Sequence, residues 1–265
     1  MTDRLVKAVE GEGYQEIISE EDARLDYLSL GKLSLQSQQT YCGETGGNEA
    51  VLVILSGVVD FSSGDQHYTE LGGRKNVFDG KATAVYVPCR SQYEIKARTE
   101  AVLAVCKAKA SERYEPFVVK PEDVIVHHRG KDSWKREVHD IITDNGEGRV
   151  QRIMIGETFN EPGNWSSYPP HKHDRDHLPE ESKLEEIYHY QLSPEQGFGV
   201  QLRYNQDRSI DEAYIVRHGD SFAIDQGYHP VIAAGGYKIY YLWFLAGEGR
   251  TYKLYDDPEH KWLME

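Results

Sequence analysis

Cysteine is scarce in this chain. Its 265 residues contain three, Cys42, Cys89 and Cys106. An odd number at these spacings matches neither a closed disulfide framework nor a zinc-binding cysteine motif. We therefore expect reduced thiols that serve as packing residues in a cytoplasmic protein.

Basic charge is also in short supply. Lys and Arg together number 30 against 44 Asp and Glu, which gives a formal net charge of −14. Binding to nucleic acid, and to anionic membrane surfaces, depends on neutralising phosphates with Lys and Arg. The composition therefore disfavours both as partners, although one or two well-placed Arg can still bind a small anion.

Long apolar runs are missing as well. No segment approaches the roughly 18 consecutive apolar residues of a membrane-spanning helix. Residues 1–11 lack the apolar stretch and the cleavage site of a secretory signal. We expect a mature protein that is not exported.

Helical periodicity is absent from the first half, where short β-branched runs are separated by Gly, Ser and Pro. This pattern is typical of an all-β sandwich or barrel. The runs that predict strands are 51–55, 58–61, 84–87, 93–97 and 101–105. Because this half contains a single histidine, His67, we expect a structural or interface module without metal ligands.

The second half follows a connection at 114–135 and repeats the β pattern. Its predicted strands are 137–142, 149–155, 199–204, 212–216, 222–224 and 237–245. Two β-rich halves with Gly corners indicate two tandem jelly-roll β-barrel domains. We place them at 1–113 and 114–265.

Four potential metal ligands are concentrated in the second half. His171 and His173 flank one residue, so their imidazoles leave the same face of a strand. Glu186 opens a second strand-like run, and His229 follows in the Gly227–Pro230 turn. Three imidazoles and one carboxylate suit Zn, Mn, Fe, Co or Ni better than a hard ion such as Ca.

Strand alternation distinguishes Glu186 from its neighbour Glu185. Residues two apart in a strand share a face, so Tyr188 and Tyr190 accompany Glu186. Glu185 and His189 then face the other way, out of the barrel. The ligand is therefore expected to be Glu186.

The same stretches resemble the two cupin motifs. The first motif matches at Gly163, at the His171–His173 pair, at Glu186 after a longer interval than usual, and at Gly197. The second matches at Gly219, Gly227 and His229. Within cupins, five blocks resemble the 5-deoxyglucuronate isomerase family, the bicupin enzymes of myo-inositol breakdown. These blocks are 163–174, 184–188, 207–209, 227–230 and 257–260. The resemblance is dense from about residue 117 onward and looser before it, where 77–80 and 86–88 also fit.

The resemblance implies an all-β bicupin with an aldose–ketose isomerase activity. The family converts 5-deoxy-D-glucuronate to 5-dehydro-2-deoxy-D-gluconate, so the partner would be a small sugar acid. A related uronate isomerase carries its metal on three His and a Glu, matching His171, His173, Glu186 and His229. Because unpaired sheet edges invite pairing, we expect a homo-oligomer from the class.

This chemistry needs a cation for the substrate's carboxylate and a group that moves a proton. Arg203, with Gln201 on the same strand face, is the favoured cation site, and its alternative is a salt bridge in the barrel wall. Lys172 and Arg175 are the next candidates for substrate binding. The proton-transfer residue stays open among Tyr228, Tyr188, Tyr204 and Asp174.

Two positions depart from the family pattern. Asp225 stands where a Pro usually precedes the Gly-Tyr-His turn, and we expect it to loosen the turn that directs His229. Trp243 stands where a polar residue is common, and we expect it to alter the floor of the cavity.

Three alternatives remain. One is a metal cupin acting on another uronate or sugar acid, and a second is a cupin dioxygenase, since the same ligands bind Fe. A third is a non-catalytic, sugar-binding regulatory cupin. That reading requires a DNA-binding helix-turn-helix domain, and the sequence shows none.

Overall fold

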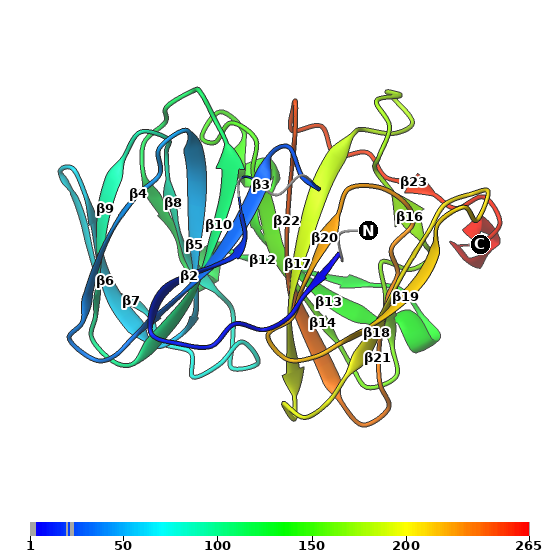
Figure 1. Cartoon of the computed structure of the whole chain (residues 1–265), viewed down its shortest axis with the longest axis horizontal. Coiled ribbons are helices and arrows are strands. Elements are labelled where there is room, and N and C mark those ends of the chain that lie inside the picture. The colour runs from blue at the N-terminus through cyan, green and yellow to red at the C-terminus, as the bar shows by residue number, and fades with distance from the viewer. Residues whose placement is uncertain (1–3, 20, 22–23, 265) are drawn as a thin grey trace.

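The computed structural model describes residues 4–19, 21 and 24–264, and its regular structure is almost entirely β (Figure 1). No α-helix occurs among the described residues, which contain only short 3-10 turns. These turns are η1 (Pro121–Asp123), η2 (Asp132–Trp134), η3 (Asp144–Gly146) and η4 (Lys261–Met264). In the described part of the chain, no helix is both long and apolar enough to cross a membrane. The all-β prediction is confirmed.

The N-terminal half is built from two facing antiparallel sheets. The six-stranded sheet has the order β11 (Phe117–Val119), β8 (Thr83–Val87), β5 (Asn48–Ser56), β10 (Ala101–Lys109), β3 (Leu28–Leu35), β2 (Gly13–Ile18). The four-stranded sheet has the order β4 (Thr40–Glu44), β9 (Gln92–Ala97), β6 (Val58–Ser63), β7 (Gln66–Gly72).

The C-terminal half repeats this plan with a larger sheet. The seven-stranded sheet has the order β1 (Leu5–Val6), β20 (Ser221–Ile224), β17 (Leu184–Ser193), β22 (Lys238–Gly247), β14 (Met154–Asn160), β13 (Arg136–Ile142), β12 (Ile125–Arg129). The smaller sheet has the order β15 (Trp165–Ser166), β21 (Val231–Ala233), β18 (Gly199–Tyr204), β19 (Asp211–Val216), and a separate pair joins β16 (His171–Lys172) to β23 (Tyr255–Asp256).

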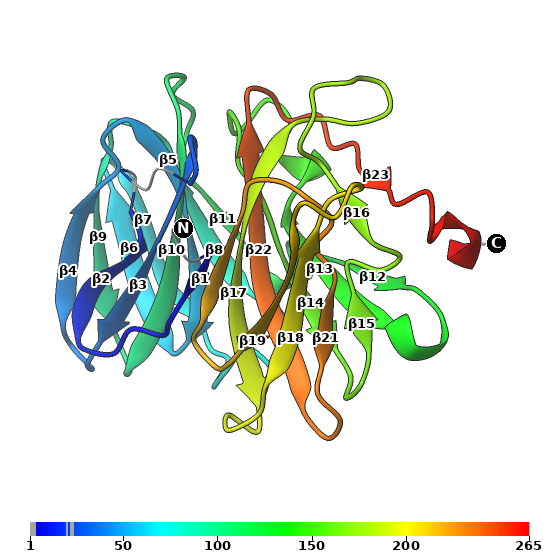
Figure 2. The same ribbon diagram turned by 45° about the vertical axis from the view of Figure 1, so that its right-hand side comes forward.

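The two large sheets lie back to back in the middle of the molecule (Figures 1 and 2). Strand β5 shows the consequence. Its Leu52 and Ile54 belong to the core inside the N-terminal half, whereas Val51 and Val53 belong to the core between the halves. Both faces are covered, so the run is apolar throughout instead of alternating. Each fully buried Val or Leu contributes about 1.5–3 kcal/mol.

Each half also contributes one strand to a sheet of the other half. β1 pairs with β20 in the C-terminal sheet, and β11 pairs with β8 in the N-terminal sheet. The segment 114–135, expected to be a plain connection, therefore contains two strands, β11 and β12. The division into 1–113 and 114–265 stays a prediction, and a cut there would separate β11 from its partner strand.

Polar contacts tie the halves together and explain an error at 149–155, where we expected one continuous strand. The carboxylate of Glu49 accepts the N–H groups of Gln151, Arg152 and Ile153 at 2.8, 2.6 and 2.8 Å. Because these N–H groups bond to a side chain, they form no ladder with a neighbouring strand. The strand therefore begins at Met154 and runs on to Asn160.

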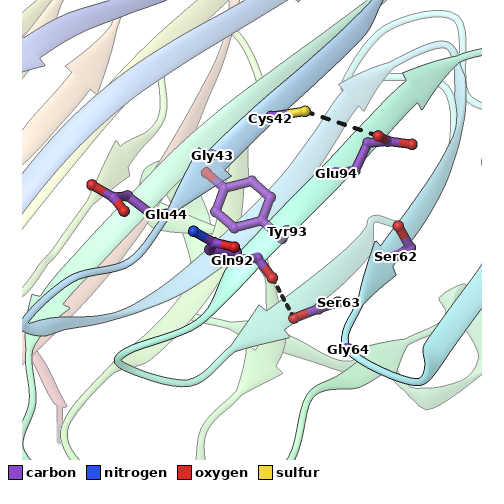
Figure 3. A pocket seen from close by; sticks show the side chains of 9 residues that line it. All are labelled: Cys42, Gly43, Glu44, Ser62, Ser63, Gly64, Gln92, Tyr93 and Glu94. Carbon is purple, nitrogen blue, oxygen red and sulfur yellow. Dashed lines mark hydrogen bonds between the residues drawn. The ribbon is translucent and has the colours of Figure 1, made fainter.

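The N-terminal half carries an open hollow of about 560 Å³ over β4, β9 and the β6–β7 turn (Figure 3). Its interactions are few: Ser63 Oγ donates to the carbonyl of Gln92 at 2.8 Å, and Cys42 Sγ lies 3.9 Å from Glu94. No group of three potential metal ligands lies there among the described residues. Strands β4 and β9 are at the end of the molecule opposite β16 and β23 (Figure 1).

Candidate metal centre

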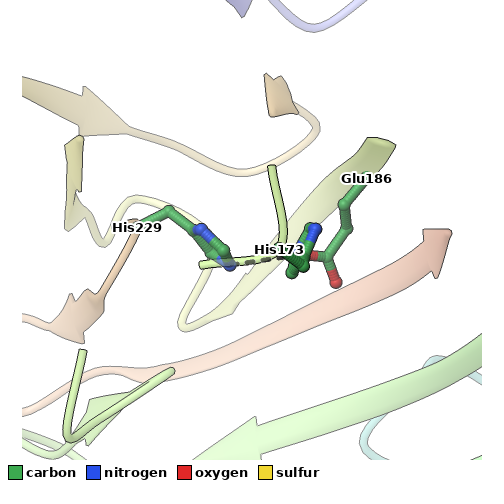
Figure 4. Close-up of side chains that lie close together, drawn as sticks. All are labelled: His173, Glu186 and His229. Atoms are coloured by element: carbon green, nitrogen blue, oxygen red, sulfur yellow. Dashed lines mark hydrogen bonds and ion pairs between the residues drawn. The ribbon is translucent and has the colours of Figure 1, made fainter. Parts of the chain in front are cut away.

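Three of the predicted ligands converge inside the C-terminal half: His173, Glu186 and His229 (Figure 4). Their ligand atoms all lie within 4.8 Å of one another, and all three side chains are buried. Glu186 Oε2 is 3.2 Å from His173 Nε2 and 3.3 Å from His229 Nε2. Glu186 projects from β17, whereas His173 follows β16 and His229 lies between β20 and β21.

Backbone carbonyls determine which imidazole nitrogens are available. His173 Nδ1 lies 2.9 Å from the carbonyl of Leu184, and His229 Nδ1 lies 2.9 Å from the carbonyl of Gly227. A carbonyl only accepts, so each Nδ1 carries the proton and each neutral ring turns an Nε2 lone pair toward Glu186. His229 Nε2 is buried and has no hydrogen-bond partner among the described residues. Lone pairs and a carboxylate facing one another fit a divalent cation.

The same two Nε2 atoms become donors to Glu186 when the imidazoles are protonated, and this pairing governs the pKa values of the group. Burial alone would raise the pKa of the Glu186 carboxyl, but His173 and His229 outweigh it and lower that pKa to about 2. For His173, burial opposes protonation, yet the hydrogen bond and charge of Glu186 raise its pKa. Glu186 is therefore ionised at neutral pH and supplies the one negative charge at the centre.

His171 lies beside this group and outside the 4.8 Å limit. Its half-buried ring has its centroid 5.2 Å from that of His229, at an interplanar angle of 89°. The pKa of His171 is well below its ordinary value because of burial and the charges of His229 and His173. Strand β16 ends at Lys172, so the rule that put His171 and His173 on one face does not extend to His173. The role of His171 as a fourth ligand stays a prediction.

Alternation along β17 separates the side chains as the pattern indicated. Tyr188 lies on the Glu186 side: its hydroxyl is 2.8 Å from Ser167 Oγ, and its ring centroid is 6.0 Å from that of His229. Glu185 faces the N-terminal half, where it accepts the N–H of Asp26 at 2.6 Å. Glu185 and His189, which were expected to point out of the barrel, are thus buried between the two halves.

Lys172 and Asp174 form a buried polar network. Lys172 Nζ donates to Asp174 at 2.5 Å and to both oxygens of Glu181 at 2.8 and 2.9 Å. Asp174 also accepts the N–H of Gly227 at 2.8 Å. Burial would raise the pKa of Asp174, but Lys172 and Gly227 lower it. Asp174 is therefore an ionised link between the first motif and the turn that holds His229.

The other proposed substrate-binding residues are also engaged within the chain, or exposed. Each nitrogen of Arg203 has a partner: Nε the carbonyl of Gln226, Nη1 Glu212 at 3.0 Å, and Nη2 Asp225 at 3.1 Å. These contacts match the alternative role considered for Arg203, a salt bridge in the barrel wall. Gln201 receives the hydroxyl of Tyr190 and donates to the carbonyl of His229. The Arg175 side chain is 75% exposed. Their substrate-binding roles stay predictions.

Tyr228 and Tyr204 lie next to one another with ring centroids 5.1 Å apart. Tyr228 donates to Gln206 at 3.1 Å, and Tyr204 donates to Asp257 at 2.7 Å. Burial raises the pKa of both phenols above the ordinary value. Both hydroxyls are therefore protonated at neutral pH and can act as donors.

The expectation for Asp225 is corrected. Asp225 accepts Arg4 Nη2 at 2.8 Å and Arg203 Nη2 at 3.1 Å, so two guanidinium groups restrain the turn before Gly227. Arg4 immediately precedes β1, and the N-terminal segment is thereby attached to the turn. The carboxylate of Asp225 therefore attaches the turn to two cations instead of loosening it.

Trp243 lies on the interior face of β22, and its effect on the floor of a cavity stays a prediction. It is directly opposite Tyr188 on one side and Gly156 on the other. A Cβ added to Gly156 would lie 2.3 Å from Trp243 Cζ2. The missing side chain of Gly156 is what accommodates the indole.

Sequence reasoning did not single out three residues around this interior: Ser166, Tyr241 and Arg136. Ser166 Oγ bonds to the hydroxyl of Tyr241, whose ring centroid is 4.4 Å from that of Tyr188. Arg136 opens β13 and donates to the carbonyl of Tyr168. The alternation of side chains along β13 and β22 could have indicated which residues face the interior, but only once the register between the strands was known.

Two facing-sheet halves, one of them enclosing a His–Glu–His group suited to a divalent ion, define a bicupin. An oxalate decarboxylase from Lactobacillus farciminis shares this fold, with a TM-score of 0.70 at 12% identity over 97% of this chain and 89% of that one. A solved IolB-like protein from Salmonella typhimurium has a TM-score of 0.94 at 30% identity, covering all of both chains.

The chain belongs to the KduI/IolB family, which it matches over residues 4–263. Curated relatives include the 5-deoxy-glucuronate isomerase of Geobacillus thermodenitrificans, 40% identical over 94% of this chain and 90% of its own length. The 5-deoxy-glucuronate isomerase of Bacillus subtilis is 38% identical over 94% of this chain and 92% of its own. The family predicted from the motifs is confirmed.

Proposed function

We propose that this protein is a cytoplasmic, metal-dependent isomerase that converts 5-deoxy-D-glucuronate to 5-dehydro-2-deoxy-D-gluconate in myo-inositol catabolism. The observation that carries the proposal is the match, over 94% of the chain, to curated 5-deoxy-glucuronate isomerases. The buried group of His173, Glu186 and His229 supplies a site for the required ion.

The ion would be held by these three residues, with His171 as the fourth ligand. Imidazole and carboxylate donors suit Zn, Mn, Fe, Co or Ni. When bound, such an ion supplies Lewis acidity to the carbonyl and hydroxyl oxygens of the sugar. The ionised Glu186 keeps the centre attractive to a cation at neutral pH.

Aldose–ketose isomerisation removes a proton from C2 and places one on C1, while the C2 hydroxyl proton is transferred to O1. Among the proton-transfer candidates, Tyr188 has the best support. Its hydroxyl lies on the Glu186 face, bonded to Ser167, and its pKa is raised by burial. A protonated Tyr188 can donate to an oxygen on which negative charge develops.

Asp174 and Tyr228 are proposed to position the site. Both oxygens of Asp174 are bonded, to Lys172 and to the N–H of Gly227, which orients the turn preceding His229. Tyr228 is adjacent to His229 in the chain and packs on Tyr204. The rings of Tyr190 and Tyr241 pack against that of Tyr188, in edge-to-face and tilted geometry, and would limit the access of water to the reacting carbons.

Proton NMR of 5-deoxy-D-glucuronate with the purified protein tests the proposal. We expect the signals of the 2-deoxy keto acid to appear, to be lost after chelation and to return with a divalent ion. Protein treated identically but inactivated by boiling is the control. Bound metal without any isomerisation would overturn the substrate assignment and leave the fold unaffected.

A second substrate is favoured by one observation, the indole of Trp243 on the interior face beside Tyr188. This bulk would restrict the sugar and could select another uronate or sugar acid. Turnover of a panel of uronates, with 5-deoxy-D-glucuronate included, decides between them by kcat/KM. No contact specifically favours a dioxygenase, and the described residues contain no helix-turn-helix.

We further propose a homo-oligomer formed through sheet edges. Strands β12 and β19 end their sheets and expose Ile125 and Ile215, at 48% and 54% of their surface. Unpaired edges with exposed apolar side chains favour pairing with another copy. Light scattering coupled to gel filtration should give a multiple of 30.3 kDa, and a mass of one chain would contradict the proposal.

A further inference from the structure

Arg136 lies on the interior face of β13. Val138, two residues along the same strand, packs against the interior core of the C-terminal half. The β14 partner of Val138 is Thr158, and the β22 partner of Thr158 is Tyr241. Because side chains two apart in a strand share a face, Arg136 points to the same side as this row.

The guanidinium of Arg136 is half-buried and has no acidic partner. Its Nη1 donates to the carbonyls of Trp134 and Tyr168 at 3.2 and 3.1 Å. In the described part of the chain, Nε and Nη2 have no hydrogen-bond partner, and no carboxylate forms an ion pair with this side chain. Arg203 and Arg74 differ, since each bonds to carboxylates at 2.7–3.2 Å.

A short chain of contacts connects Arg136 to the metal centre. The carbonyl of Tyr168 accepts a hydrogen bond from Arg136 Nη1. Tyr168 follows Ser167 in the chain, and Ser167 bonds to the hydroxyl of Tyr188. The Tyr188 ring packs 6.0 Å from that of His229.

The substrate's own structure requires such a cation beside the ligands. In 5-deoxy-D-glucuronate the reacting carbons are C1 and C2, and three further carbons separate C2 from the carboxylate carbon. The carboxylate therefore lies next to the metal centre and not within it. A carboxylate that enters the interior beside the ion and is not bound to it needs a positive partner of its own.

We propose that Arg136 binds the substrate's carboxylate through Nε and Nη2, which makes it a specificity-determining residue. This inference rests on the proposed function and identifies the group that distinguishes a sugar acid from a neutral sugar. The planar guanidinium presents two parallel N–H donors to the two carboxylate oxygens. The bonds from Nη1 to two carbonyls hold this fork in place.

The test uses a ligand that binds without reacting: the open-chain alcohol made by reducing the aldehyde of 5-deoxy-D-glucuronate, and its primary amide. Binding of both to the metal-loaded protein is measured by calorimetry for the wild type, Arg136→Gln, Arg136→Lys and Arg217→Gln. Arg217 is the control because it follows β19 in the same half of the chain and is exposed.

We expect Arg136→Gln to weaken binding of the acid by roughly 10- to 100-fold, the range for loss of charge-assisted hydrogen bonds. Binding of the amide should change little, so the preference for the acid disappears. Arg136→Lys should retain part of the preference, and Arg217→Gln all of it. Metal content and melting temperature of each variant show whether the fold and the ion are intact.

The outcomes separate this inference from the proposed function. Equal loss of acid and amide binding in Arg136→Gln, or acid binding as tight as in Arg217→Gln, would overturn it. So would a wild type that does not prefer the acid to the amide. A wild type that prefers the acid through Arg136 but does not isomerise 5-deoxy-D-glucuronate would support the inference and refute the proposed reaction.

Discussion

Asp174 Oδ2 accepts the backbone N–H of Gly227 at 2.8 Å, and this bond joins the two segments that carry the histidines. Asp174 follows His173 directly, while the carbonyl of Gly227 receives Nδ1 of His229. Gly227 has φ +91°, a conformation that is strained for any residue with a side chain. As a glycine, it can present its N–H to Asp174 and its carbonyl to His229 at once. The orientation of both imidazoles thus depends on one carboxylate.

We expect Asp174→Ala to weaken metal binding by roughly 10- to 100-fold, as is typical when a group that orients a ligand is lost. Competition with a chromophoric chelator measures the affinity. Asp65→Ala, at an exposed turn of the N-terminal half, is the control. An unchanged affinity in Asp174→Ala would show that Lys172 and Glu181 hold the loop without it.

Glu186→Gln should abolish metal retention and isomerisation, because it removes the negative charge between His173 and His229. The control is Glu185→Gln. Its side chain leaves the opposite face of β17 and accepts N–H groups from Asp26 and Tyr27, which an amide oxygen can still do. Elemental analysis should find the metal in Glu185→Gln only, and its loss from both variants would contradict the assignment.

Arg4→Ala should destabilise the fold by about 1–3 kcal/mol, since it leaves Asp225 with one guanidinium in a part-buried position. Urea unfolding gives the free energy. Lys238→Ala breaks an ion pair of similar length whose side chains are 50% and 65% exposed. Exposed pairs contribute about 0–1 kcal/mol, so an effect of Arg4→Ala no larger than this control would refute the anchoring role.

Stability should fall in mild acid because of His189. Burial, followed by the charges of His218 and Lys32, lowers its pKa to about 4, below the usual value of 6.5. Between these values the unfolded chain binds a proton that the folded chain does not, so the free energy of unfolding decreases as pH falls. Protonation of His189 leaves the free energy of unfolding unchanged above pH 6.5 and lowers it by about 3 kcal/mol at pH 4.

Urea unfolding at several pH values between 7.5 and 4.5 checks this for the wild type and His189→Gln. The difference between the two isolates His189 from other groups that titrate in the same range. Glutamine can keep a hydrogen bond to Ser221 Oγ, which lies 2.9 Å from His189 Nδ1. Parallel pH curves for the two proteins would contradict the prediction.

Much of the fold was predictable because short apolar runs and turn residues are local properties. The error at 149–155 shows the limit. The apolar residues there predicted a strand, but Glu49, more than 100 residues earlier, takes the N–H groups of Gln151, Arg152 and Ile153. A side chain so distant in the sequence leaves no local signal.

The candidate site divides in the same way. His173, Glu186 and His229 belong to motifs that a sequence displays, and they meet in the structure. Arg203 was chosen from its place in a strand, but Glu212 and Asp225 occupy its nitrogens. Arg136 carries no motif, and only the register of β13 against β14 and β22 places it on the interior face.

The sequence by itself determined the β class, the family and the residue types at the metal centre, because these depend on patterns within short segments and on motif chemistry. The tertiary structure decided which charges are compensated and which faces are covered. Both properties depend on contacts between distant segments: Arg4 reaches Asp225, and the back of β17 is buried beneath the N-terminal half. The lack of an acidic partner for the Arg136 guanidinium is a result of the same kind, since only the packed chain shows that no carboxylate meets it among the described residues.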